Sequence, residues 1–324
     1  MSLRELWFAA PGQVELREGA AVPVQEGQLR VRGLCSGVSQ GTELLLFKGE
    51  GPTPFDPSLD APGAPTYPRR YGYAWVGEVT ESRAAVDALR VGTRVFGLLP
   101  HGDEHVVSAA RLRALPDDTP AERAALAANL ETAVNVVWDA GVAVGDEVVV
   151  IGGGVVGLLV GHVARLGGAQ VRVLEPSEAR RRAAQLLGLE AASPESAGSQ
   201  PADIVVEASG NPATLDLAIS LAREEGVVAV ASFYGERVAP VRLGAEFHRR
   251  RLSLKASQVS RLPPSRAPGW SFERRFGLVA RLLGDSRLDV LLERPSPFAE
   301  APAVYARLAE APGQHLQSIF SYRR

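Results

Sequence analysis

Several residue types are scarce in this chain of 324 residues, and their scarcity limits what the protein can be. Cys35 is the only cysteine, which excludes a disulfide within the chain and a cysteine-rich zinc lobe. The sequence lacks a run of roughly 18 apolar residues, as a membrane span needs, and lacks the basic and apolar start of a signal peptide. We therefore expect a cytoplasmic protein without a membrane partner. Lysine is nearly absent beside abundant arginine, and we infer no function from that.

Net charge is also small. The 35 basic and 37 acidic residues leave a formal charge of −2, which gives no general attraction to nucleic acid or anionic membranes. A hydrophobic content of 46% with 22% charged residues is that of an ordinary globular protein, and the length fits two domains. A small-molecule substrate is the partner we expect.

A glycine-rich turn near the middle of the chain is the strongest motif. A β-branched run ends at Gly152-x-Gly154-x-x-Gly157 and passes into an apolar segment suited to a helix, which begins with Val155 and Val156. Gly152 permits a tight turn, Gly154 lets a pyrophosphate approach the backbone, and Gly157 lets helix and strand pack closely. This arrangement predicts a dinucleotide-binding βαβ unit that includes all five residues.

A carboxylate follows at the expected place. The next expected strand, 170–174, ends at Glu175, about 20 residues after the glycines, where a ribose-binding acid belongs. Such a carboxylate accepts a hydrogen bond from the ribose 2′-hydroxyl and repels a 2′-phosphate, which favours NAD(H). Arg180, Arg181 and Arg182 would favour phosphate, but they lie on the following helix. We predict NAD(H), with NADP(H) as the less favoured alternative.

Two patterns divide the chain. Up to residue 120, alternating apolar and polar residues predict strands at 13–17, 28–34, 74–79 and 92–97, with a Pro- and Gly-rich loop at 51–68 that could cover a site. Strands at 147–151, 170–174, 203–207, 227–231 and 252–256 then alternate with helices at 120–140, 155–166, 177–188 and 212–224. Helices near 276–283 and 301–308 precede a strand at 316–320 that returns to the first domain. We predict an α/β protein with a β-rich domain, 1–120 and 259–324, and a doubly wound parallel sheet, 121–258.

In a doubly wound sheet the ligand lies beyond the carboxyl ends of the strands. Ser209 and Gly210 follow one expected strand, Ser232 follows the next, and Ser257 and Gln258 follow the last. We therefore expect these residues to contribute to the dinucleotide site.

The domain order resembles the medium-chain dehydrogenase/reductase superfamily over nearly the whole chain. Residues 37–43 resemble the segment after its second long strand, residues 72–79 its Gly-His-Glu segment, and Glu175 with Arg180 its Asp-x-x-x-x-Arg segment. Residues 37–45 and 247–258 are most similar to the branch that contains bacteriochlorophyllide-type dehydrogenases and uncharacterised zinc-binding relatives. The resemblance implies a GroES-like catalytic domain, a Rossmann domain, NAD(P)-dependent oxidoreductase activity, an arginine against adenine, and a homodimer joined through the nucleotide sheet.

The sequence departs from this family where zinc would bind. Zinc-dependent members carry cysteine where Ser39 stands, His-Glu where Tyr73 and Ala74 stand, and a further ligand near Ala128. Serine, tyrosine and alanine do not supply the ligand set that Zn²⁺ needs. We predict an enzyme without zinc.

Proton donors must then come from side chains. Tyr73 stands where the resemblance directs a histidine into the pocket, and its phenol can donate at neutral pH. His101 lies in an expected pocket loop and titrates near physiological pH, while Ser39 could serve as an oxygen ligand or relay. A packed tyrosine, a surface histidine and a turn serine are the structural alternatives. A metal held by His101 and His105 is another alternative, without an evident third ligand.

Hydride delivery to a conjugated double bond depends less on a Lewis acid than ketone reduction does. We expect an NADH-dependent reductase of an activated C=C bond, for example reducing 3,3-dimethylacrylyl-CoA, a short branched enoyl-CoA, to isovaleryl-CoA. The alternatives are an NAD(P)-dependent secondary alcohol or ketone dehydrogenase of a larger metabolite, and a nucleotide-binding redox sensor without catalysis. Arginines could hold phosphates of coenzyme A or of the dinucleotide, or could simply be surface residues: Arg249, Arg250, Arg251, Arg261, Arg266, Arg274 and Arg275.

Overall fold

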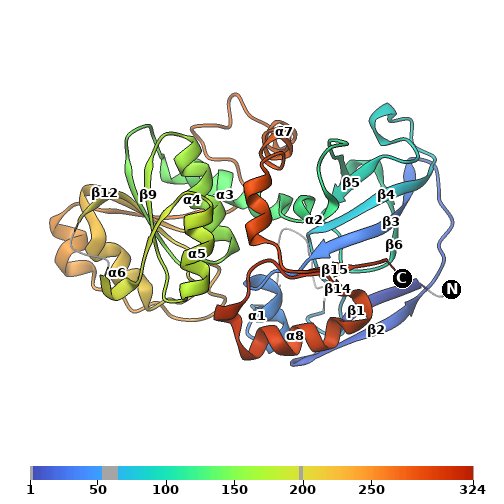
Figure 1. The fold of residues 1–324 in the computed structure, drawn as a ribbon, viewed down its shortest axis with the longest axis horizontal. Helices are drawn as coiled ribbons and strands as arrows, with labels where there is room; N and C mark the ends of the chain where they lie inside the picture. Colours follow the sequence, from blue (N-terminus) through green and yellow to red (C-terminus); the bar gives the residue numbers. More distant parts are fainter. Residues whose placement is uncertain (1–2, 53–64, 197–199, 324) are drawn as a thin grey trace. The chain divides into compact units, whose positions relative to one another are not determined.

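The computed structural model describes residues 3–52, 65–196 and 200–323 (Figure 1). The chain divides into two compact units, which are Met1–Ala128 with Ala280–Arg324, and Asn129–Val279. We call them the first and the second unit. This division differs from the expected boundaries at residues 120 and 259, because residues 259–279 make contacts within the second unit.

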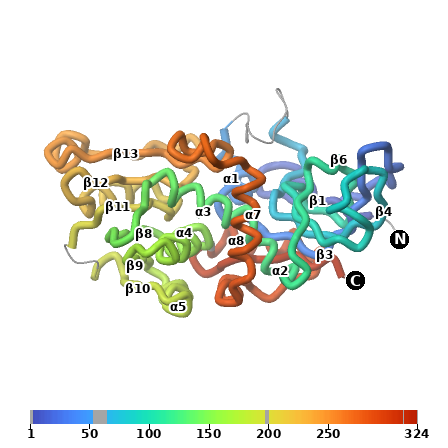
Figure 2. Tube along the Cα trace, turned by 90° about the horizontal axis from the view of Figure 1, so that it is seen from above, coloured from blue at the N-terminus to red at the C-terminus, as the bar shows by residue number. Residues whose placement is uncertain are grey.

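A parallel sheet forms the centre of the second unit. Within the described residues it has six strands in the order β10-β9-β8-β11-β12-β13, which Figure 2 shows from above. Their bounds are β8 Glu147–Ile151, β9 Gln170–Leu174, β10 Glu190–Ala192, β11 Ala202–Glu207, β12 Ala222–Val230 and β13 Ser253–Ala256. The order reverses direction between β8 and β11, and in such sheets the ligand binds at that switch point.

Helices pack on this sheet along its strands. α4 contacts β8 and β9, α5 contacts β9 and β10, and α6 contacts β8, β11 and β12. The helices of the unit span α3 Ala127–Ala140, α4 Val155–Leu166, α5 Glu178–Leu186, α6 Thr214–Leu221 and α7 Phe272–Leu282, α3 and α7 crossing the unit boundaries. Because right-handed crossovers leave the switch point in opposite directions, they cover both faces of the sheet. The central strands are therefore apolar on both sides, as in the buried run Val148–Ile151.

Antiparallel strands dominate the first unit. Among its described residues, one sheet runs in the order β14-β15-β3-β4-β5-β7, β6 pairs with β3, and β1 and β2 form a separate pair. The bounds are β1 Leu3–Ala10, β2 Gln13–Gly19, β3 Gln28–Gly37, β4 Trp75–Ser82, β5 Arg94–Gly97, β6 Glu104–Ser108, β7 Leu112–Ala114, β14 Ser296–Pro297 and β15 Ile319–Ser321. The α-helices α1 Thr42–Lys48, α2 Ala121–Ala124 and α8 Ala301–Glu310 accompany them. Trp75, Tyr305 and Phe320 are fully buried in its core.

The predicted fold class is confirmed in both units. The strand at the C-terminus does return to the first unit, since β15 pairs with β3. Two predicted helices are wrong in extent. The helix at 120–140 is broken into α2 and α3, and the helix at 212–224 ends at Leu221, where the chain enters β12.

The predicted covering loop at 51–68 lies largely outside the described residues, which resume at residue 65. In the part of the chain that the structure describes, none of the helices has the length and apolar character needed to cross a membrane.

Candidate active site and cofactor site

The glycine turn after β8 has the features that its sequence predicts. Gly152 has a φ of +103°, and a Cβ there would lie 2.6 Å from the Cα of Ser209. At Gly157 a Cβ would lie 2.0 Å from the carbonyl oxygen of Gly152, so only glycine lets α4 begin so close to the strand. At Gly154 a Cβ would meet no described atom within 4 Å. The open space beside Gly154, at the start of α4, fits the approach of a pyrophosphate.

Glu175 faces this turn. Its side chain is almost completely buried, and its two carboxylate oxygens accept hydrogen bonds from the backbone N–H groups of Gly153, at 2.7 Å, and Ser177, at 2.8 Å. Each oxygen keeps a lone pair for a further donor such as a ribose hydroxyl. Arg181 donates to the backbone carbonyls of Glu175 and Pro176, at 2.8 and 2.6 Å. Arg181 therefore braces the turn that carries Glu175.

A second buried carboxylate, which the sequence did not indicate, lies at the end of β11. Glu207 is fully buried and accepts hydrogen bonds from the Ser209 N–H, at 2.8 Å, and from the hydroxyl groups of Ser209, Thr214 and Tyr234. Burial and the bond to Glu207 raise the pKa of Tyr234, so its phenol stays protonated and donates. This cluster fixes the loop after β11.

The predicted loop residues fall into two groups. Gly210 N–H donates to Ser232 Oγ at 2.9 Å, so these two lie together at the end of β11 and β12. Ser257 donates to Asp139 on α3 at 2.7 Å, and the Gln258 carbonyl accepts from Asn135 at 3.3 Å. Val155 and Val156 are half-buried in the first turn of α4, and Arg180 is half-buried on α5.

The surroundings of Arg275 contradict its suggested role as a phosphate ligand. It is 4% exposed, and its guanidinium donates to Glu131 at 3.1 Å, to Asn135 at 2.8 Å and to the Val259 carbonyl at 2.8 Å. The residue ties α7 to α3 inside the second unit, so its charge is used within the protein.

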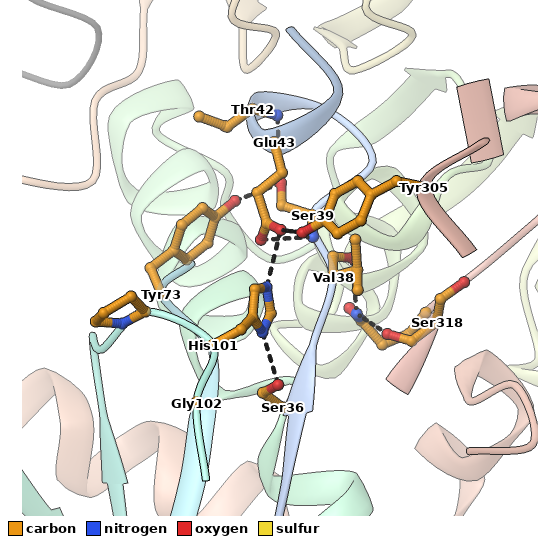
Figure 3. Close-up of polar contacts among 12 residues, drawn as sticks. Ser36, Val38, Ser39, Thr42, Glu43, Tyr73, His101, Gly102, Tyr305 and Ser318 are labelled. Carbon is orange, nitrogen blue, oxygen red and sulfur yellow. Dashed lines mark hydrogen bonds and ion pairs between the residues drawn. The ribbon is translucent and has the colours of Figure 1, made fainter. Parts of the chain in front are cut away.

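Ser39 and Tyr73, two of the predicted catalytic residues, meet in the first unit (Figure 3). The Tyr73 hydroxyl donates to Ser39 Oγ at 2.5 Å, and the Thr42 N–H donates to the same oxygen at 3.2 Å. Both side chains are half-buried. A serine oxygen has two lone pairs, and these two donors use them. The Ser39 hydrogen must therefore point in a third direction, as a donor.

His101 lies behind this pair and is completely buried, so the surface-histidine alternative is wrong. Its Nε2 lies 2.9 Å from Glu43 Oε2, and its Nδ1 lies 2.7 Å from Ser36 Oγ (Figure 3). Tyr305, also fully buried, donates to the same Glu43 oxygen, and burial and that carboxylate raise the pKa of Tyr305 well above its usual value. His101 can therefore reach a substrate only through its neighbours.

Sequence reasoning missed Glu43, which links these two groups. Its Oε1 accepts the Ser39 N–H at 3.0 Å, while Oε2 faces His101 and Tyr305. Ser39 in turn accepts from the first turn of α1. Ser39 and Glu43 thus exchange hydrogen bonds at the start of α1, but Gly41 is the N-cap of this helix, and the spacing of the pair differs from the Ser-x-x-Glu of a capping box. Local spacing therefore gave no standard signal for Glu43.

The residues at the family's zinc positions do not fit a zinc ion. The hydroxyls of Ser39 and Tyr73 bond each other, and Ala74 and Ala128 offer no side-chain donor. His105 donates toward the Pro100 carbonyl, at 2.9 Å, and does not join His101 at a shared position. In the described ranges, groups of three or more His, Cys, Asp or Glu that could hold a metal are absent.

Comparisons with known proteins agree with the dinucleotide-binding fold. Residues 155–269 match the family model described as zinc-binding dehydrogenase. The chain is 25% identical to D-guloside 3-dehydrogenase of Escherichia coli (strain K12), covering 95% of this chain and 96% of that one. It is 28% identical to 2-desacetyl-2-hydroxyethyl bacteriochlorophyllide A dehydrogenase of Cereibacter sphaeroides, over 92% and 91%. A putative zinc-binding dehydrogenase from Sinorhizobium meliloti 1021, solved bound to NADP, has a TM-score of 0.81 at 21% identity, over 99% of both chains.

A dinucleotide fold with an intact glycine turn, joined to a β-rich unit, defines an NAD(P)-dependent oxidoreductase. More closely, residues 155–269 match the zinc-binding dehydrogenase family, and nearly the whole chain is similar to the two dehydrogenases named above.

Proposed function

We propose that this protein interconverts a secondary alcohol and its ketone on a metabolite larger than a simple alcohol, using NAD(H) and no catalytic metal. The relatives named above are dehydrogenases of D-guloside and of a bacteriochlorophyllide. They favour this reaction over reduction of an enoyl-CoA, the specificity expected first, which has no support among them.

The observation that carries the proposal is the pair of donors at Ser39 Oγ. Because the Tyr73 O–H and the Thr42 N–H both donate to this oxygen, the Ser39 O–H is available for a substrate carbonyl. NADH held at the glycine turn would supply the hydride that reduces the carbonyl carbon. Ser39 gives its proton to the resulting alkoxide oxygen, Tyr73 returns a proton to Ser39, and water reprotonates Tyr73. His101, the third predicted residue, acts behind them.

A substrate panel tests this reaction. Purified protein is assayed with NADH against cyclic and polyhydroxylated ketones on one side and enones and enoyl thioesters on the other. We expect turnover of ketones, unchanged after dialysis against a chelator, and less than one tenth of an equivalent of zinc per chain by elemental analysis. Turnover of enoyl thioesters alone would refute the proposal, as would stoichiometric zinc with loss of activity on its removal.

The preference for NAD(H) rests on Glu175, whose buried carboxylate repels a 2′-phosphate. The relative solved with NADP shares the fold at 21% identity and does not decide the matter. We expect the dissociation constant of NADPH to exceed that of NADH by at least tenfold, measured by fluorescence titration. Equal affinity for both would contradict the role assigned to Glu175.

We also propose that two copies associate through β13. All four residues of this strand, Ser253–Ala256, are exposed, and β13 is at the end of the strand order. An exposed edge offers unpaired backbone groups that a second copy can match across a two-fold axis. Light scattering of the purified chain should report a dimer, and a proline at Leu254 should shift it to monomer.

A further inference from the structure

The buried polar groups behind Ser39 form one continuous chain of hydrogen bonds. Gly102 N–H donates to the Tyr322 hydroxyl at 3.1 Å, which lies 2.7 Å from Ser36 Oγ. Ser36 Oγ lies 2.7 Å from His101 Nδ1, and His101 Nε2 lies 2.9 Å from Glu43. The linked residues come from β3, α1, the loop before β6 and the C-terminal segment, and Figure 3 shows His101 between Glu43 and Ser36. All five are nearly or fully buried.

The direction of this chain follows from counting hydrogens. Gly102 can only donate, so the Tyr322 oxygen accepts and its own hydrogen must go to Ser36. Burial raises the pKa of Tyr322, so that hydrogen is present. Ser36 must then donate to His101 Nδ1, and the histidine carries its hydrogen on Nε2.

The opposite direction leaves a buried donor without an acceptor. If His101 carried a hydrogen on Nδ1, Ser36 would accept it and donate to Tyr322. The Tyr322 oxygen would then receive two hydrogens, and its own hydrogen would have no acceptor within the described residues. Buried donors are rarely left without an acceptor, because burial removes their hydrogen bonds to water and the protein then offers none in exchange.

At its other end the chain stops at a carboxylate that only accepts. Glu43 receives hydrogens from His101 Nε2, from Tyr305 and from the Ser39 N–H. Because Glu43 is surrounded by three hydrogen-bond donors and has no acceptor in the described part of the chain for a hydrogen of its own, its carboxyl group must be ionised. Arginine and lysine are absent from the described partners of Glu43, so this negative charge is held by neutral donors.

We propose that Glu43 and His101 are positioning residues, a neutral Nε2–H imidazole and an ionised carboxylate whose fixed hydrogen-bond direction holds Ser39 as a proton donor. The inference rests on the proposed reaction, in which Ser39 protonates the substrate oxygen. Glu43 fixes the Ser39 backbone by accepting a hydrogen bond from the Ser39 N–H. His101 holds the Glu43 carboxylate in the orientation that reaches both the Ser39 N–H and the His101 ring. Neither residue touches the substrate.

The first test reads the histidine directly and needs no activity. Nitrogen-15 NMR of the imidazole rings separates a nitrogen that carries hydrogen from one that does not, and the His101→Gln variant assigns the signal. We expect hydrogen on Nε2 and none on Nδ1 at neutral pH. Hydrogen on Nδ1, alone or with Nε2, would overturn the inference. Failure of the proposed reaction would leave this result unaffected.

The second test reverses the polarity with the smallest change of shape. Glu43→Gln can still accept from the Ser39 N–H, but its amide N–H₂ would face the hydrogens of His101 and Tyr305. The direction of the hydrogen bonds from Glu43 to Tyr322 must therefore reverse. We expect kcat to fall at least tenfold, the cofactor dissociation constant to stay within twofold, and the His101 hydrogen to move to Nδ1. The matched control is Glu15→Gln, the same change at an exposed residue that pairs with Arg17, which should leave all three unchanged.

A milder variant covers the case in which Glu43→Gln does not fold. Tyr322→Phe removes only the hydroxyl that donates to Ser36, and the ionised Glu43 still accepts from Nε2, so we expect the Nε2–H form to remain in the His101 spectrum. A change to an Nδ1–H form in Tyr322→Phe would overturn the inference, as would a folded Glu43→Gln protein with wild-type kcat.

Discussion

Ser39 occupies a family position whose usual cysteine binds metal through sulfur, yet here the side chain oxygen accepts two hydrogen bonds. Its neighbours Tyr73 and Thr42 supply them. A residue that accepts twice and donates once is suited to give up a proton and to recover it from a neighbour. The substitution of one atom, sulfur by oxygen, therefore changes the chemistry that the same loop can perform.

The two hydroxyl groups should make unequal contributions to the reaction. Ser39→Ala removes the group that reaches the substrate, and we expect kcat for ketone reduction to fall by about 100-fold. Tyr73→Phe removes only the relay, and water can replace it, so a loss of about tenfold is expected. Steady-state kinetics with NADH measure both. A larger loss in Tyr73→Phe than in Ser39→Ala would make tyrosine the direct donor.

The folding stability of the first unit should depend on pH through His105. Burial, followed by the nearby Arg70, lowers its pKa to about 3, whereas an unfolded histidine has a pKa near 6.5. The unfolded chain therefore takes up a proton below about pH 6.5 while the folded one does not, and stability falls as pH decreases toward 3. At about pH 5 the loss is on the order of 2 kcal/mol.

Urea denaturation at neutral pH and at about pH 5 measures this loss. His105→Gln keeps a donor toward the Pro100 carbonyl and removes the ionisable group, so its stability should depend less on pH. The exposed His248→Gln serves as the control and should behave as the wild type. Identical pH dependence in all three proteins would contradict the buried neutral state of His105.

At the scale of elements, the βαβ turn separates the structural from the ligand-binding glycine. A methyl group at Gly157 would overlap the Gly152 carbonyl, whereas one at Gly154 meets no described atom. We expect Gly157→Ala to lower the thermal midpoint of the protein. Gly154→Ala should keep that midpoint and weaken NADH binding at least tenfold. Calorimetry and fluorescence titration measure the two effects, and the reverse pattern would contradict this division of roles.

Arg275 links two helices and makes a testable contribution to stability. Arg275→Met keeps the apolar stem but leaves Glu131, Asn135 and the Val259 carbonyl without the donor they share. Breaking a buried charged network of this kind costs about 3 kcal/mol. The exposed Arg261→Met on the same segment should cost less than about 0.5 kcal/mol. Equal losses of unfolding free energy for the two variants in chemical denaturation would mean that Arg275 contributes no more to stability than an exposed arginine.

The elements also explain what the sequence could predict. The turn at Gly152 and the acid at Glu175 are local signals, because a strand, a tight turn and a helix follow one another within about 30 residues. The chain from Tyr322 through Ser36 and His101 to Glu43 joins residues that are distant in sequence. Neither spacing nor periodicity relates such residues, so only the folded molecule reveals that His101 is buried behind Ser39.

The break between α6 and β12 shows the other limit of local patterns. Leu221, Ala222 and the following residues are compatible with a helix, but β12 pairs with β11 and β13 on both sides. Strand pairing overrides helix propensity in that position. A predicted helix end next to a parallel sheet is therefore less secure than the presence of the helix.

The whole molecule consists of two units that each bury an apolar core of their own. The dinucleotide-binding turn, Glu175 and Glu207 belong to the second unit, and the Ser39 cluster belongs to the first. Ligand binding stabilises only the state that holds the ligand. The cofactor should therefore stabilise the two units unequally, a property that neither a single residue nor a single element can have.

Hydrogen exchange followed by mass spectrometry measures this difference for each unit. With NADH at 100 times its dissociation constant, the free energy of opening in β8 and β9 should rise by about 2.7 kcal/mol, while that in β1 and β2 should stay within about 0.5 kcal/mol. At the same NADH concentration, a tenfold weaker binding in Gly154→Ala should reduce the rise to about 1.4 kcal/mol without changing exchange in the absence of NADH. An equal rise in both units would mean that they open together, and the roles assigned to their separate cores would then be wrong.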